Sequence, residues 1–93
     1  MNLGYLNETP TKRVYNSNTA TATPGNVISL NFDPTWDGYT VVGIITWATG
    51  NRNVTIYHLN SRLMQLQNTS TSNQTVNVGD AYIDFVYKRN IQS

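Results

Sequence analysis

Hydrophobic and polar residues alternate at a period of two along several short segments of this chain, as they do in half-buried β-strands. The clearest segment is 26–32, where Ile28, Leu30 and Phe32 fall on one face and Ser29 and Asn31 on the other. Turn-forming residues separate such segments about every 8–12 residues, and no segment keeps a helical period over a useful length. The pattern therefore predicts an all-β fold, a small antiparallel β-sandwich.

The predicted strands are short and rich in β-branched and aromatic residues, and they cover residues 11–15, 19–23, 26–32, 38–47, 54–59, 62–67, 75–78 and 81–88. Alternation places the following side chains on inward faces: Val54, Ile56, His58, Met64, Leu66, Val76, Val78, Ala81, Ile83, Phe85 and Tyr87.

The segment 38–47 is the longest apolar run, and it is apolar on both of its faces. Alternation puts Tyr39, Val41, Gly43, Ile45 and Trp47 on one face and Thr40, Val42, Ile44, Thr46 and Ala48 on the other. A strand of a small antiparallel sandwich normally exposes one polar face to water. Either loops of the same chain cover the second face, or another subunit does.

Length favours help from another subunit. A chain of 93 residues forms one domain, and it buries only about 60–65% of the surface that its unfolded form exposes. We expect an extended lead-in or linker at residues 1–10 and a single domain at 11–93. Cysteine is absent, so no disulfide can add stability, and oligomerisation remains. The outward faces of 38–47 and 81–88 predict an oligomer interface at Val42, Ile44, Tyr82 and Val86.

Charge and composition exclude several classes of partner. The formal net charge is +1 and only 12% of residues are charged, so the surface is polar but nearly uncharged. Nucleic-acid binding needs clustered Lys and Arg, which this chain lacks. No apolar run reaches the length of a membrane span, so no membrane insertion is expected. No Cys or His cluster and no acidic loop with calcium-ligand spacing occurs, so we expect no metal and no cofactor.

Catalytic residues are equally scarce. The single histidine, His58, lies in the middle of a predicted strand, where a packed or exposed structural role is the simpler interpretation. Asp33 and Asp37 share one loop, but a Pro-led turn explains both as turn-capping residues. Glycosidase chemistry needs two carboxyl groups at a fixed separation on a rigid cleft. The sequence therefore predicts no catalytic residues and a protein that is not an enzyme.

Aromatic residues next to neutral amides and hydroxyls are the more informative set. Sugars are commonly held by an aromatic plane together with amide and hydroxyl partners, and two loops that flank the segment 38–47 offer both. We predict ligand contacts at Trp36, Asp37, Arg52 and Tyr57. The alternative for Trp36, as for Trp47, is packing over the edge of the sandwich, because large aromatic side chains are usually mostly buried.

The chain contains the strand and turn patterns Gly38-Tyr39-Thr40-Val41-Val42-Gly43-Ile44, Leu66-Gln67-Asn68-Thr69-Ser70, Val76-Asn77-Val78, Phe85-Val86-Tyr87-Lys88, and Pro24-Gly25-Asn26 before a strand. These patterns resemble those of the C-terminal receptor-binding head domains of phage tail fibres and related receptor-binding proteins. The resemblance covers most of the chain, from Thr19 to Arg89. Its motifs are structural patterns and carry no catalytic signature.

The resemblance implies a jelly-roll-like sandwich that forms a homotrimer on a virion, contacts other virion proteins and binds a glycan or protein of the bacterial surface. An alternative is a capsid or head-fibre decoration protein whose aromatic residues serve subunit contacts. A further alternative is a carbohydrate-binding module, which we expect to be monomeric.

Overall fold

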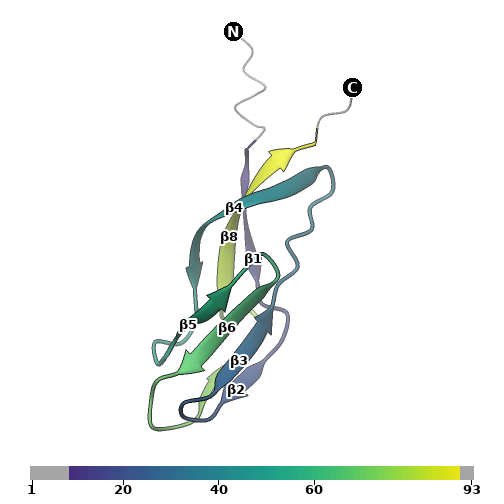
Figure 1. The fold of residues 1–93 in the computed structure, drawn as a ribbon. Helices are drawn as coiled ribbons and strands as arrows, with labels where there is room; N and C mark the ends of the chain where they lie inside the picture. The colour runs from purple at the N-terminus through teal and green to yellow at the C-terminus, as the bar shows by residue number, and fades with distance from the viewer. Residues whose placement is uncertain (1–8, 91–93) are drawn as a thin grey trace.

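The protein is built from β-strands and loops, with no helix in the part that the computed structural model describes, residues 9–90. The eight strands are β1 (Thr11–Tyr15), β2 (Ala20–Ala22), β3 (Val27–Asn31), β4 (Tyr39–Ala48), β5 (Val54–Leu59), β6 (Leu63–Asn68), β7 (Gln74–Val76) and β8 (Tyr82–Arg89) (Figure 1). The all-β prediction is confirmed. In the same part of the chain, no helix is long and apolar enough to cross a membrane.

The strands form three antiparallel sheets with the orders β1-β8-β4, β3-β6-β5 and β2-β7. β1 and β2 follow each other along the chain and pair with β8 and β7, so together they form one long ladder with a break in its middle. Between the pairs Tyr15↔Tyr82 and Ala20↔Val76, one side of the ladder advances five residues and the other six. The ladder therefore changes register at the break.

The break is occupied by Asn16, a polar residue that is almost completely buried. Its amide nitrogen donates to the carbonyl oxygens of Asn18 (2.7 Å) and Asn77 (3.0 Å). Its side-chain oxygen accepts from the backbone N–H groups of Gly79 (3.0 Å) and Ala81 (3.0 Å). One side chain thus replaces the ladder hydrogen bonds that the change of register removes, and this satisfies the buried backbone groups.

The two three-stranded sheets share one core. β3 and β6 contribute Leu30, Met64 and Leu66, and β8 contributes Phe85 and Tyr87, all with no exposed surface. Complete burial of such side chains stabilises the fold by about 1.5–3 kcal/mol each. This packing is consistent with a small β-sandwich, and it confirms the predicted inward faces of these strands. Val78 is an exception, since it lies in the turn after β7 and is 57% exposed.

In β4 the predicted alternation is wrong, because the strand contains two bulges. Its register against β8 shifts between Val41 and Gly43 and again between Ile44 and Thr46. Each bulge adds one unpaired residue and reverses the face of every residue that follows. Val41 and Ile44 therefore both pack on the core, although alternation places them on opposite faces.

A third bulge changes the faces of β5 in the same way. The register against β6 shifts between Ile56 and His58, so Leu59 packs on the core and His58 is exposed. The residues inside the three bulges, Val42, Ile45 and Tyr57, are 57%, 55% and 63% exposed. β4 and β5 are edge strands that lie along the same side of the molecule (Figure 1). The apolar surface of the segment 38–47 is thus exposed at Val42 and Ile45 on the edge strand β4, whereas Ile44 of the predicted second face packs on the core.

The molecule is elongated, with principal extents of 57 × 20 × 18 Å and a radius of gyration of 15.8 Å. A compact chain of this length has a radius of gyration of about 12 Å. Figure 1 shows the reason: β1, the start of β4 and the end of β8 continue beyond the β3-β6-β5 sheet as a protruding ribbon. Pairing along this ribbon begins before β1, since the Pro10 carbonyl oxygen accepts from the Tyr87 N–H at 2.9 Å. Residues 1–8 of the predicted lead-in and residues 91–93 lie outside the described residues.

Candidate functional site

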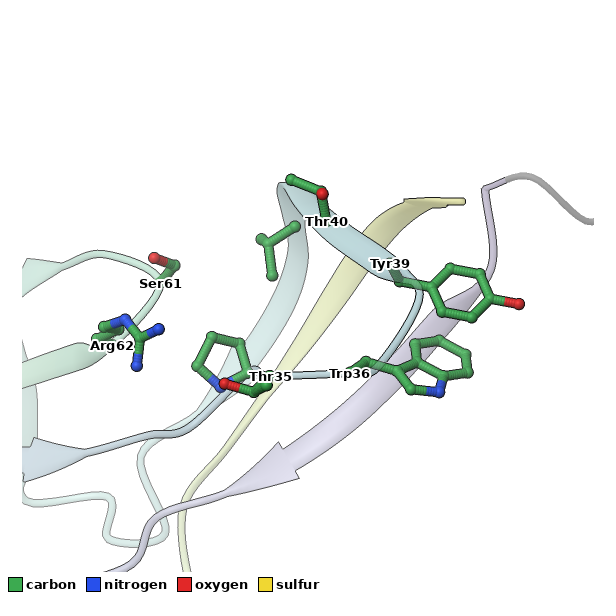
Figure 2. Close-up of a pocket in the computed structure, with 8 residues that line it drawn as sticks. Thr35, Trp36, Tyr39, Thr40, Ser61 and Arg62 are labelled. Carbon is green, nitrogen blue, oxygen red and sulfur yellow. The ribbon is translucent and has the colours of Figure 1, made fainter. Parts of the chain in front are cut away.

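A hollow of about 320 Å³ opens where the protruding ribbon meets the β3-β6-β5 sheet (Figure 2). Three separate segments form it: the β3–β4 loop, the start of β4 and the turn between β5 and β6. Its lining consists of Pro34, Thr35, Trp36, Tyr39, Thr40, Val41, Ser61 and Arg62. Hydroxyl groups, one guanidinium group and a small apolar floor thus meet in a place that only the folded chain creates.

The β3–β4 loop is held in place by hydrogen bonds at both of its sides. The Asp33 carboxylate accepts from the backbone N–H and the hydroxyl of Thr35, at 3.1 and 2.6 Å, which is the Asx-type cap expected of this turn. On the inner side, the Tyr87 hydroxyl donates to the buried Pro34 carbonyl oxygen at 2.7 Å. Burial, with a smaller contribution from the Asp33 charge, raises the pKa of Tyr87. This tyrosine therefore stays protonated and keeps its bond to the loop.

Trp36 is a packing element at the rim of the hollow. Its ring stacks on Tyr39, with a centroid distance of 4.1 Å and an interplanar angle of 25°, and it meets Tyr87 edge-on at 5.0 Å. The Lys12 ammonium group lies 5.5 Å from the ring centre. Figure 2 shows the stacked rings pointing away from Ser61 and Arg62. Trp36 therefore shapes one end of the hollow, and its indole face is already covered by Tyr39.

Arg62 supplies the one positive charge of the lining. The Asn60 side chain accepts from the Arg62 backbone N–H at 2.9 Å, which fixes the β5–β6 turn. The guanidinium group points across the hollow toward the β3–β4 loop (Figure 2). Its nearest acid is Asp33, with Nη1 and Oδ1 3.9 Å apart, and both side chains are largely exposed. Hydrogen bonds from Thr35 lower the pKa of Asp33, and the Arg62 charge adds to this, so the carboxyl group is ionised at neutral pH.

The four predicted ligand-contact residues do not meet in one site. Trp36 lines the hollow, and Asp37 lies beside it in the same loop but outside the lining. Arg52 is exposed in the β4–β5 loop, at the other end of a ten-residue strand, about 25–30 Å away. Tyr57 is exposed at the β5 bulge.

The four predicted interface residues also separate. Val42 projects from a bulge on the free edge of β4, whereas Ile44 packs inward on the core. Tyr82 and Val86 lie half-buried on the outer face of β8, between β1 and β4. Ile44 therefore cannot contribute to an interface, because it packs in the core of its own chain. The other three predicted interface residues lie on β8 and on the free edge of β4.

The outer face of β1 and β8 carries an ordered ion pair. The Arg13 guanidinium donates to both oxygens of Asp84, from Nε at 2.8 Å and from Nη2 at 3.0 Å. It also lies over the Tyr82 ring, 3.8 Å from its centre, and Tyr15 meets that ring edge-on. The hydrogen bonds from Arg13 lower the pKa of Asp84. Both arms of this guanidinium are therefore hydrogen-bonded, whereas Arg62 faces its acid, Asp33, across a longer ion pair of 3.9 Å.

A second hollow, of about 390 Å³, lies near the end of the protruding ribbon and is lined by Thr40, Val42, Lys88, Arg89 and Asn90. It contains two cations but only one hydroxyl group, whose hydrogen is donated to the Asn90 side chain at 2.7 Å. Within residues 9–90, no group of three or more acidic or histidine side chains could hold a metal ion.

Comparison with known proteins gives no match: no family model fits the chain, and neither a curated protein nor a solved structure matches it at a significant level.

Proposed function

We propose that this protein is a non-enzymatic attachment domain of a phage virion, which binds a glycan of the host surface in the hollow between the β3–β4 loop and the β5–β6 turn. The observation that carries the proposal is the lining of that hollow, in which hydroxyl groups and one guanidinium surround a small apolar floor. Sugars offer hydroxyl groups and an apolar ring face, and such sites bind with few, well-placed polar partners.

The residues that carry the resemblance to tail-fibre heads have defined structural roles, which supports the proposal. In the turn Asn68-Thr69-Ser70, the buried Asn68 oxygen accepts from the Ser70 N–H at 2.8 Å and from its hydroxyl at 2.7 Å. The Asn68 amide nitrogen donates to the carbonyl oxygens of Ala22 and Ser72, both at 2.8 Å. Gly38 takes a positive φ of 85° just before β4, which favours glycine there.

In this proposal the domain is a jelly-roll-like homotrimer. The support is the set of exposed large apolar side chains on the edge strands β4 and β5, which are Val42, Ile45, Trp47 and Tyr57. Unpaired edge strands with exposed apolar side chains are prone to association with further chains. Light scattering at micromolar concentration tests the stoichiometry, and a stable, soluble monomer would contradict the trimer.

Binding in the hollow is tested on an array of bacterial surface glycans with two variants. Ser61→Trp places a large side chain at the mouth of the hollow, and Thr71→Trp makes the same change in the exposed β6–β7 loop. We expect the first variant to lose binding and the second to keep it. Equal binding by both variants would show that glycans do not occupy the hollow.

The same exposed apolar side chains of β4 and β5 favour a second candidate function. In it, the protein is a capsid or head-fibre decoration protein that uses these residues for contacts with other virion proteins. Electron cryomicroscopy of the particle separates the two functions. Density for this chain at the distal tail supports attachment, whereas a lattice on the shell supports decoration.

A further inference from the structure

We infer that the hollow selects an anionic sugar, one that carries a carboxylate or phosphate group, and that Arg62 is the residue that selects it. The inference rests on the proposed function, because it concerns the glycan bound in the same hollow. It goes beyond that function because it assigns a negative charge to the ligand and names the residue that binds the charged group.

Arg62 is the one cation in the lining of the hollow, and its guanidinium keeps hydrogen-bonding capacity for a ligand beside its long, exposed ion pair with Asp33. Among residues 9–90 its guanidinium makes no hydrogen bond, and its distance of 3.9 Å to Asp33 is too long for one. Arg13 shows the contrast, since both arms of its guanidinium already hold Asp84. A guanidinium presents a planar fork that fits a carboxylate or phosphate group with two parallel hydrogen bonds.

The remaining lining suits the ring of the same ligand. Thr35 gives its hydroxyl hydrogen to Asp33, so its oxygen is left as an acceptor facing the hollow. The Ser61 hydroxyl lies next to Arg62 on the β5–β6 turn (Figure 2). The volume of about 320 Å³ lies at the small end of the range for ligand sites.

Asp33 sets how strongly Arg62 attracts an anion. Its carboxylate is ionised, held by two hydrogen bonds from Thr35, and lies on the loop that faces Arg62. A ligand anion at the guanidinium is therefore repelled by Asp33. Two substitutions should act in opposite directions: Arg62→Gln weakens anion binding, and Asp33→Asn, which keeps an oxygen to accept from Thr35, strengthens it.

The experiment measures binding to the wild-type chain by titration calorimetry and by amide chemical shifts. The probes are trigalacturonate, its fully methyl-esterified form, and glucose 6-phosphate with glucose as its neutral match. We expect the charged probes to bind up to about five-fold more tightly than their neutral matches, with the difference shrinking as salt is raised. The amides of the β5–β6 turn should shift on titration.

Four variants locate the effect. Arg62→Gln should remove the preference for the charged probes, and Asp33→Asn should increase it. Arg52→Gln, an equal change of charge on an exposed distant loop, should leave it unchanged. Loss of the preference in Arg89→Gln but not in Arg62→Gln would place anion binding in the second hollow and overturn the inference.

The outcomes also separate this inference from the proposed function. Equal binding of charged and neutral probes, blocked by Ser61→Trp, would overturn the choice of an anionic sugar and leave glycan binding in the hollow standing. Absence of binding to every probe here and to every glycan on the array would overturn both. Tighter binding of the phosphate probe than of the carboxylate probe, or the reverse, identifies which anionic group the Arg62 guanidinium prefers.

Discussion

The break in the ladder between β1-β8 and β2-β7 gives the sharpest test of how this fold is held, because a single side chain fills it. Asn16→Ala removes four hydrogen bonds, and it leaves the buried Ala81 N–H without its partner. Each such bond contributes a net amount of about 0.5–1.5 kcal/mol, and a water molecule entering the space can replace part of the loss. We therefore expect the free energy of unfolding to fall by about 2–4 kcal/mol.

That loss is large for a domain of this size, whose total stability is about 5–15 kcal/mol. The midpoint of thermal unfolding should fall by about 10–25 °C, measured by circular dichroism, and urea unfolding should give the free energy directly. The matched control is Asn73→Ala, an exposed asparagine without side-chain hydrogen bonds among the described residues, which should change stability by less than about 0.5 kcal/mol.

Asn16→Asp tests the direction of the hydrogen bonds. It preserves the shape and the acceptor for two N–H groups, but it sets an oxygen against the carbonyl oxygens now 2.7 and 3.0 Å from the amide nitrogen. We expect a loss at least as large as for alanine. If Asn16→Ala cost less than about 1 kcal/mol and Asn16→Asp were tolerated, the break would not depend on this side chain.

Three further predictions concern other parts of the fold. Gly50→Ala should destabilise by about 2 kcal/mol or more, because φ is +74° and a Cβ would lie 2.6 Å from the Asp80 carbonyl oxygen; stability close to wild type in urea would contradict this. Tyr87→Phe should cost about 1–2 kcal/mol and loosen the β3–β4 loop, seen as faster amide exchange there, since a buried carbonyl loses its donor. Arg13 lowers the pKa of Asp84 in the folded state, so the ionised Asp84 stabilises the fold. This stabilisation is complete above the unfolded pKa of about 4, and it disappears as the pH falls through the folded pKa. Thermal melts of Asp84→Asn should lack this loss of stability at acid pH.

The sequence by itself determined the strands and most of the core. In β3, β6 and β8 the apolar residues recur at a period of two, and Leu30, Leu66 and Phe85 are buried as that period predicts. This works because a strand without bulges sends successive side chains to opposite faces, whatever its neighbours are. The positions of the turns between the strands could also be predicted, because the φ preferences of turn residues depend on the local sequence.

The candidate site was only partly readable. Trp36 was predicted and does line the hollow, but Ser61 and Arg62 of the β5–β6 turn were not predicted. Nothing in the local sequence indicates that this turn faces the loop at Asp33, because the approach depends on how one sheet lies over another. The predicted partners Arg52 and Tyr57 lie elsewhere for the same reason.

Only the tertiary structure decided which side of β4 and β5 faces the core. A bulge arises from the match between two paired strands, so the sequence of one strand does not reveal it, yet each bulge reverses all the faces beyond it. Ile45 is exposed and Ile44 is turned inward for that reason, whereas alternation alone already placed Val42 and Tyr57 outward. Likewise, the sequence around Asn16 indicates only an ordinary turn. Its structural role depends on the pairing of β1 with β8 and of β2 with β7, which creates the break that its side chain fills.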